Sequence, residues 1–164
     1  MGTRSRIGVM HGNICKSVYC HWDGYLEHNG VILQEHYNSA KANHLVALGD
    51  ISSLGPKLGE AHPFSKYEIK EDSPDFAKLM ALHEQAEAEG WTTFYNRDRG
   101  ESGTDFKAAM NFSEFLEQVE NCGGEYYYVM ENGQWYCGSM YGKFKGRLVL
   151  LSEALASIKQ AEEV

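Results

Sequence analysis

The chain lacks several features that would place it in a common class of protein. No apolar run approaches the roughly 20 residues of a membrane-spanning helix, and no long apolar stretch follows the arginines of MGTRSRIGVMHG. We therefore expect neither a membrane anchor nor a secretory signal. A Gly-rich phosphate-binding fingerprint is also missing, which argues against a Rossmann-like sheet. Without internal repeats or low-complexity tracts, the 164 residues suit one compact domain.

Paired cysteine motifs are missing too. The cysteines are Cys15, Cys20, Cys122 and Cys137, and no two of them have CxxC spacing, which is common in zinc and redox sites. A chain of this length with ordinary apolar content needs no disulfides in order to fold. We therefore expect reduced thiols in a cytoplasmic protein, while the even number of cysteines leaves disulfides open.

Basic charge is scarce, and its distribution is uneven. The net charge is −8. Residues 1–67 hold six Lys or Arg against five Asp or Glu, whereas residues 68–164 hold nine against eighteen. General nucleic-acid binding is therefore not expected, because phosphate contact needs a basic face. The acidity fits simple solubility, a basic protein partner or mimicry of nucleic acid.

Strand and turn patterns predict an α+β fold. Residues 5–10 and 14–22 are rich in β-branched and aromatic residues around a His-Gly-Asn turn, and a second hairpin, EYYYVM and QWYCGSM, surrounds Asn132-Gly133. Because the strands occur as hairpins, we expect an antiparallel sheet built from an N-terminal and a C-terminal hairpin, with helices packed mainly on one face. The remaining pattern predicts a strand at 91–95 and helices at 29–37, 40–48, 74–89, 113–121 and 152–162.

The stretch VYCHWDGY, residues 18–25, is the densest group of reactive side chains. Alternation along a strand places Cys20 and Trp22 on the expected core face and Tyr19 and His21 on the other face. A shared metal ion is disfavoured, because the adjacent Cys20 and His21 point to opposite faces. Metal ligands and cofactors are therefore not among our expectations.

Two other interpretations of the same stretch stay open. In the first, His21 is a general base that Asp23 orients, with any bridging group supplied by another segment. In the second, the stretch is structural: Trp22 and Tyr19 fill the core and its rim, and Asp23-Gly24 turns the chain.

A second cluster, NRDRGE at residues 96–101, carries two arginines around an aspartate. We expect it to form a polar loop after the strand at 91–95, in which Arg97 and Arg99 present a fork to a phosphate or carboxylate. The alternative is that Asp98 and Glu101 merely neutralise them on the surface. Arg4 and Arg6 on the first strand could join the arginines. The predicted ligand site therefore has Tyr19, His21 and Tyr25 as one wall and Arg97, Asp98 and Arg99 as the charged wall.

These segments resemble a family of small accessory proteins of tailed bacteriophages. The resemblance rests on MGTRSRIG, VYCHWDGYLEHNGVILQEHY, LGDISSLG, FYNRDRGE and EYYYVMENGQWYC, in this order and up to about residue 137. The family motif GRDRGE is NRDRGE here. The resemblance implies no activity and no site residue. It does imply expression in the cytoplasm of an infected bacterial cell, in a role such as host takeover or counter-defence. Residues 60–90 match least well, which suggests a variable helical insert within a single domain 1–164.

The leading expectation is a non-enzymatic protein that inhibits or sequesters a host protein or a small anionic ligand such as a nucleotide. The alternative is a small enzyme acting on nucleotides or nucleic acid, in which His21 and Asp23 work with Arg97 and Arg99. A structural module that uses the edge of a hairpin is a third class, and homo-oligomerisation is left open. Replacing His21 separates the first two classes.

Overall fold

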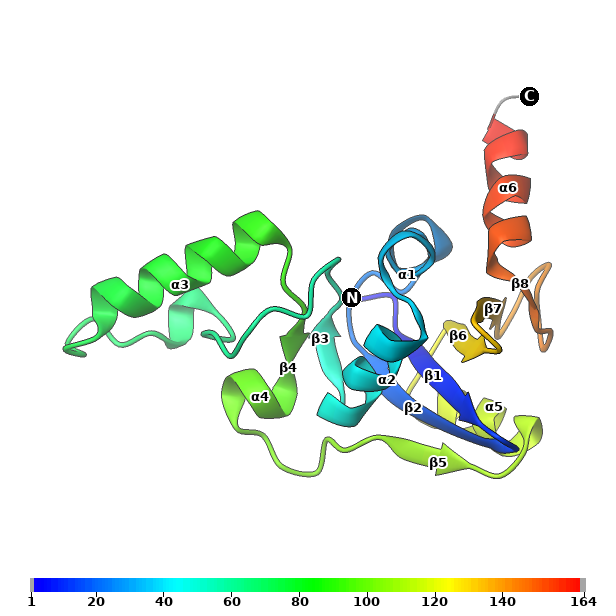
Figure 1. Cartoon of the computed structure of the whole chain (residues 1–164), viewed down its shortest axis with the longest axis horizontal. Coiled ribbons are helices and arrows are strands. Elements are labelled where there is room, and N and C mark those ends of the chain that lie inside the picture. Colours follow the sequence, from blue (N-terminus) through cyan, green and yellow to red (C-terminus); the bar gives the residue numbers. More distant parts are fainter. Residues whose placement is uncertain (1, 163–164) are drawn as a thin grey trace.

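A computed structural model describes residues 2–162, which form one eight-stranded sheet in the order β4-β3-β2-β1-β6-β7-β8, with β5 paired to β2 (Figure 1). Both expected hairpins are present, and they meet at the centre of the sheet. Asn132 and Gly133 both have positive φ, as a tight two-residue turn demands. The strands are β1 (Ser5–His11), β2 (Ile14–Cys20), β3 (Ile51–Ser53), β4 (Thr93–Phe94), β5 (Lys107–Ala109), β6 (Tyr126–Glu131), β7 (Gln134–Ser139) and β8 (Val149–Leu150).

Helices cover both faces of this sheet, three of them on one side. α1, α2 and α6 pack on the face that holds Ile7, Val18 and Tyr128, and α5 packs on the opposite face against Tyr127. The α+β class and the bias of the helices toward one face are therefore confirmed. The helical segments are η1 (Leu26–Gly30), α1 (Val31–His36), α2 (Ser39–Leu48), η2 (Lys66–Glu68), α3 (Phe76–Glu89), α4 (Tyr95–Arg99), α5 (Phe112–Asn121) and α6 (Leu151–Glu162).

The structure corrects four details of the sequence-based picture. The sheet is mixed, because β1 pairs with β6 in parallel and β2 meets β3 in parallel. Trp22 is 43% exposed and does not enter the core. The other face of β2 is also buried at Cys15 and Ser17, because α5 and β5 cover it. NRDRGE lies mostly within α4 rather than in a loop, and Gly100 in the left-handed conformation ends that helix.

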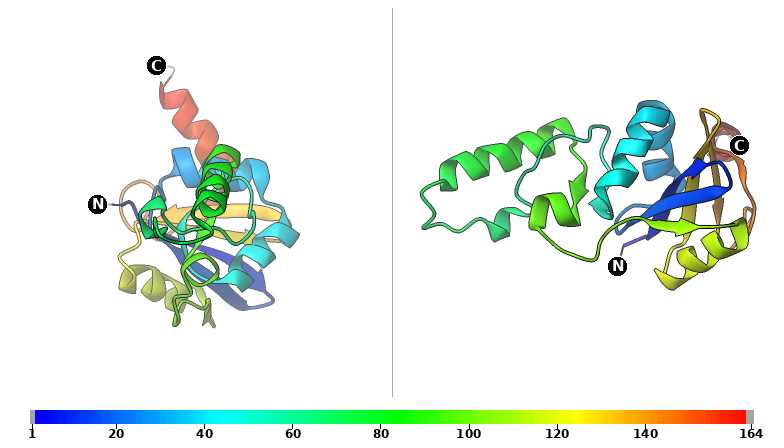
Figure 2. Two further views of the ribbon diagram at one scale, coloured as in Figure 1. Left: turned by 90° about the vertical axis from the view of Figure 1, so that its left-hand side faces the viewer. Right: turned by 60° about the horizontal axis from the view of Figure 1, so that its bottom comes forward.

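Residues 59–90 form an arm that projects from the sheet, as Figure 1 and the right-hand view of Figure 2 show. Its two ends meet where Lys57 bridges Trp91, with the Thr92 N–H donating to the Lys57 carbonyl at 2.8 Å. Gly59 has a φ of +67°, and a Cβ there would collide with the Trp91 ring.

Helix α3 runs along the arm and buries little of itself. The helix that the sequence predicts at 74–89 is present as α3, yet Ala86 is its only buried residue. Within residues 2–162, no helix combines the length and the apolar character that crossing a bilayer requires.

Candidate functional site

Close backbone packing shapes the loop at residues 22–25. Asp23 adopts a φ of +55°, and the Gly24 N–H donates to the Thr3 carbonyl at 2.8 Å. A Cβ on Gly24 would lie 2.7 Å from the Cβ of Ser5, so a side chain cannot fit there. Asp23-Gly24 is thus the turn that the sequence predicts.

The buried Asn29 supports this loop from below. Its Nδ2 donates to the Cys20 Sγ at 3.3 Å and to the Ser5 Oγ at 3.5 Å. The Tyr128 hydroxyl donates to the Gly24 carbonyl at 2.6 Å. Cys20, Ser5 and Asn29 are therefore buried. The side chains of Tyr19, His21 and Trp22 lie closer to the surface.

Tyr19, His21 and Trp22 form a continuous aromatic group. The Tyr19 hydroxyl lies 2.6 Å from the His21 Nδ1, and the imidazole meets the Trp22 ring edge-on at a centroid distance of 4.7 Å. Burial raises the pKa of Tyr19 to about 12, so its phenol stays protonated and can donate to Nδ1. In that arrangement Nε2 carries the imidazole proton of His21. We call Tyr19, His21, Trp22 and the neighbouring Arg4 the aromatic face.

Arg4 supplies the positive charge of this face. Its side chain is exposed, and none of the carboxylates in the described part of the chain lies within 4.0 Å of it. Burial, and secondly the positive field of Arg4, lower the pKa of His21. Arg6 is only 2% exposed and donates to the Ser17 Oγ and carbonyl, both at 2.9 Å, so it does not present its charge to a ligand.

The catalytic pair His21 and Asp23 is not assembled. No ion pair within 4.0 Å joins these two described residues, and Tyr19 holds the His21 Nδ1 instead. Among residues 2–162, no three His, Cys, Asp or Glu side chains are grouped closely enough to hold a metal ion.

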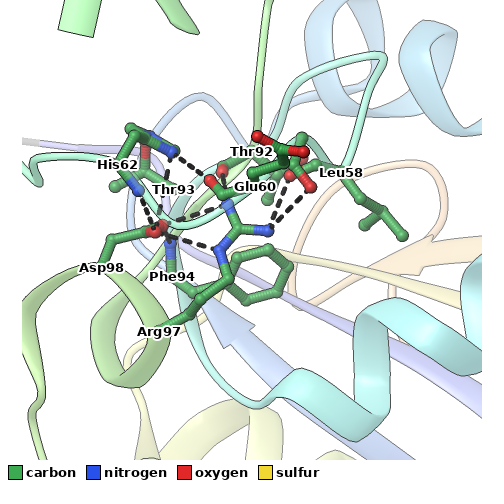
Figure 3. A network of polar contacts seen from close by, with 9 residues as sticks. Leu58, Glu60, His62, Thr92, Thr93, Phe94, Arg97 and Asp98 are labelled. Carbon is green, nitrogen blue, oxygen red and sulfur yellow. Dashed lines mark hydrogen bonds and ion pairs between the residues drawn. The ribbon is translucent and has the colours of Figure 1, made fainter. Parts of the chain in front are cut away.

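Asp98 is the centre of a separate polar network, shown in Figure 3. Its side chain is fully buried. Oδ1 accepts the backbone N–H of His62 at 3.1 Å, and Oδ2 accepts that of Phe94 at 2.7 Å. Arg97 donates to both oxygens, at 2.9 and 3.2 Å. Asp98 thus joins the start of the arm to β4 and α4, and we call His62, Arg97 and Asp98 the latch.

Arg97 uses its whole guanidinium within the protein. Besides Asp98, it donates to the carbonyls of Leu58, Gly59 and Thr92, at 2.8, 3.4 and 2.8 Å (Figure 3). A guanidinium has five N–H groups, and all of them are directed at protein acceptors. No donor of Arg97 is left for a phosphate.

Thr93, His62 and Asp98 follow one another like the hydroxyl, imidazole and carboxylate of a nucleophilic triad. Nε2 is 3.3 Å from the Thr93 Oγ1, but Nδ1 donates to the Glu60 carbonyl at 2.7 Å, whereas the Asp98 Oδ1 lies 3.6 Å away. A triad needs its carboxylate to hold Nδ1. Because a backbone carbonyl does so here and other donors occupy Asp98, the latch is a structural element.

Arg99 lies on the outside of α4. Its guanidinium stacks 3.9 Å above the centre of the Phe64 ring and pairs with Glu68 and Glu101, at 3.4 and 3.1 Å. Together with Ile69, Leu79 and other residues, the arginines and Asp98 border a cavity of about 580 Å³ in the arm. The alternative interpretation of NRDRGE, neutralisation by neighbouring carboxylates, therefore describes Arg99.

The two predicted walls are neighbours in the chain fold, but they do not line one pocket. The Asp50 carboxylate accepts the Tyr19 N–H at 2.8 Å, and its carbonyl accepts the Tyr95 N–H at 3.2 Å, so α4 begins beside Tyr19. The cavity bordered by Arg97, Asp98 and Arg99 contains none of Tyr19, His21 and Tyr25 in its lining. Tyr25 packs against His28 instead, at a centroid distance of 6.0 Å.

Sequence reasoning missed two polar residues that position these groups. Asp50 follows the glycine that ends α2 and accepts hydrogen bonds from two segments. An Asp directly after such a helix end is a signal that could have marked it. His62 lies in an irregular segment, and no local pattern marks it.

Comparison of the chain with models of known protein families, with curated proteins and with solved structures finds no match.

Proposed function

We propose that the chain is a non-enzymatic binding protein that sequesters a small anionic ligand with a planar ring, such as a nucleotide, at the aromatic face. One observation carries the proposal. Arg4 is an exposed guanidinium without a carboxylate partner among the described residues, and it lies close enough to Tyr19 and His21 to influence both pKa values.

The chemistry of the face suits such a ligand. A guanidinium binds phosphate or carboxylate oxygens through two parallel N–H groups. Trp22 is 43% exposed, and a nucleobase can stack on its ring. The Nε2–H of His21 supplies one further donor between the two groups.

We expect the ligand to bind at the aromatic face alone. Arg97 and Arg99, the other candidates for phosphate contact, already bind protein acceptors. The net charge of −8 opposes a long polyanion, whereas a single small anion needs only one basic contact. A nucleotide bound in this way would be removed from solution in the infected cell, which fits the counter-defence role implied by the phage resemblance.

The experiment is a titration of the whole chain with adenosine and guanosine 5′-phosphates, followed by calorimetry and by Trp fluorescence. Replacing Arg4 with Gln, or Trp22 with Ala, should weaken binding about tenfold or more, which corresponds to about 1.4 kcal/mol. Arg147→Gln and Tyr67→Ala are matched controls, because both side chains are exposed and Tyr67 lies in the arm. Equal affinities of all four variants would refute the proposal.

The enzyme alternative is tested in the same samples. Product formation from each nucleotide is followed over time with the wild type and with His21→Ala. A turnover that His21→Ala abolishes, with binding retained, would replace the proposed sequestering role by catalysis.

A further inference from the structure

The arm, residues 59–90, has no part in the proposed ligand site, and its structure is unusual for an isolated element. α3 runs for 14 residues with only Ala86 buried. A helix in a protein is stabilised mainly by packing of its apolar face, and here that face is half open. Figure 2 shows α3 well separated from the sheet in its right-hand view.

The base of the arm is nevertheless fixed. The latch fastens His62 and the carbonyls of Leu58 and Gly59 to α4 and β4 through hydrogen bonds from His62 N–H to Asp98 and from Arg97 to the two carbonyls. The Lys57–Trp91 bridge closes the other side. The arm is therefore presented in one orientation, which reduces the entropy lost when a partner binds.

Charge is concentrated on the arm. Residues 59–90 hold eight carboxylates and three lysines, a net charge of −5 within a chain of −8. All but one of these carboxylates are exposed. Such a surface attracts a positively charged partner and repels nucleic acid.

An apolar groove accompanies this charge. The cavity of about 580 Å³ is lined on its apolar side by Phe64, Ile69, Leu79 and Leu82. Tyr67, which is 86% exposed, lies between Phe64 and Ile69 in the sequence. A groove of this size accepts a large apolar side chain, and an aromatic residue in the lining, here Phe64, is typical of protein interfaces.

We propose that the arm is a docking surface for a basic protein segment, in which an apolar side chain enters the groove and flanking lysines or arginines meet the carboxylates. A second copy of the chain is a poorer occupant, because two chains of −8 repel each other. The proposal is independent of ligand binding at the aromatic face.

The test uses the full chain and two short synthetic peptides labelled with fluorescein. One is rich in Lys and Ala with a central pair of leucines, and the other has serines in place of the leucines. The leucine peptide should bind about tenfold tighter, because the leucines are buried in the groove. Leu79→Gln should remove this difference. Amide shifts in NMR spectra should change along residues 59–90.

Surface variants keep the test valid if Leu79→Gln disturbs the arm. Glu71→Gln with Asp72→Asn removes two exposed charges from the arm, and Glu117→Gln with Glu120→Gln removes two from α5. The first pair should weaken binding severalfold more than the second. Equal losses would mean attraction by net charge alone and would overturn the proposal. So would equal binding of both peptides, or a chain that dimerises through the arm in light scattering. Nucleotide affinity should be unchanged in all these variants.

Discussion

At the scale of single residues, the two arginine-bearing segments behave in opposite ways. Arg97 donates to the carbonyls of Leu58 and Thr92 and to Asp98, although its sequence context suggested a phosphate fork. Arg4, in the segment before β1, keeps its guanidinium exposed beside the rings of the aromatic face. A charge pattern in a sequence cannot tell these cases apart, because the difference depends on which carbonyl groups the fold brings within reach.

Replacing Arg97 with Met should destabilise the protein by about 3 kcal/mol, because it leaves a buried carboxylate without its cation. Asp98 is fully buried, and Arg97 supplies the only guanidinium that contacts it among the described residues. The free energy of unfolding in urea measures the effect. Arg99→Met is the control and should change stability little, since Arg99 is exposed. Similar unfolding curves for the two variants would contradict the latch.

The pKa of His21 offers a direct test of the aromatic face. Burial and the Arg4 charge both disfavour the imidazolium, so His21 should titrate below the usual range for histidine. Arg4→Gln removes the second cause, and the pKa should therefore rise. NMR titration of the imidazole protons measures both values. An unchanged pKa in Arg4→Gln would show that the guanidinium lies too far away to share a ligand with His21.

At the scale of elements, the arm should be separable from the sheet. Lys57 and Trp91 already pair, so a short Gly-Ser linker can join Leu58 to Trp91 in place of residues 59–90. The shortened chain should fold with its sheet intact and lose about 1–3 kcal/mol, because Asp98 loses the His62 N–H as a donor. Circular dichroism and thermal melting test this. A chain that no longer folds would show that the arm belongs to the core.

Elements differ in how far local sequence determines them. The hairpin at Asn132-Gly133 was predictable, because turn chemistry and strand alternation are local signals. The parallel pairing of β1 with β6 was not, because it joins segments about 120 residues apart and leaves no trace in either. The helix at Tyr95–Arg99 was missed although Gly100, which ends it, is visible in the sequence. For the proposed ligand site, alternation placed Tyr19 and His21 on one face correctly, but the position of Arg97 required the tertiary structure.

At the scale of the whole molecule, a core lies on each face of one sheet, and this arrangement explains the burial of the cysteines. α1, α2 and α6 cover Cys20 and Cys137, and α5 with β5 covers Cys15. All four thiols are free in the structure, and only Cys122, which follows α5, is partly exposed. A two-sided core of this kind protects its thiols only while the helices on both faces stay in place.

Thiol reactivity should therefore report on the intact fold. Burial raises the pKa of Cys15 to about 12, of Cys20 to about 11 and of Cys137 to about 12. Reaction needs the thiolate and access, so these three should react slowly with Ellman's reagent at neutral pH. Cys122 should react first, and Cys122→Ser should abolish the fast phase. In denaturant all four should react together. Rapid labelling of a second cysteine in the native protein would mean that one of the two helical layers opens readily.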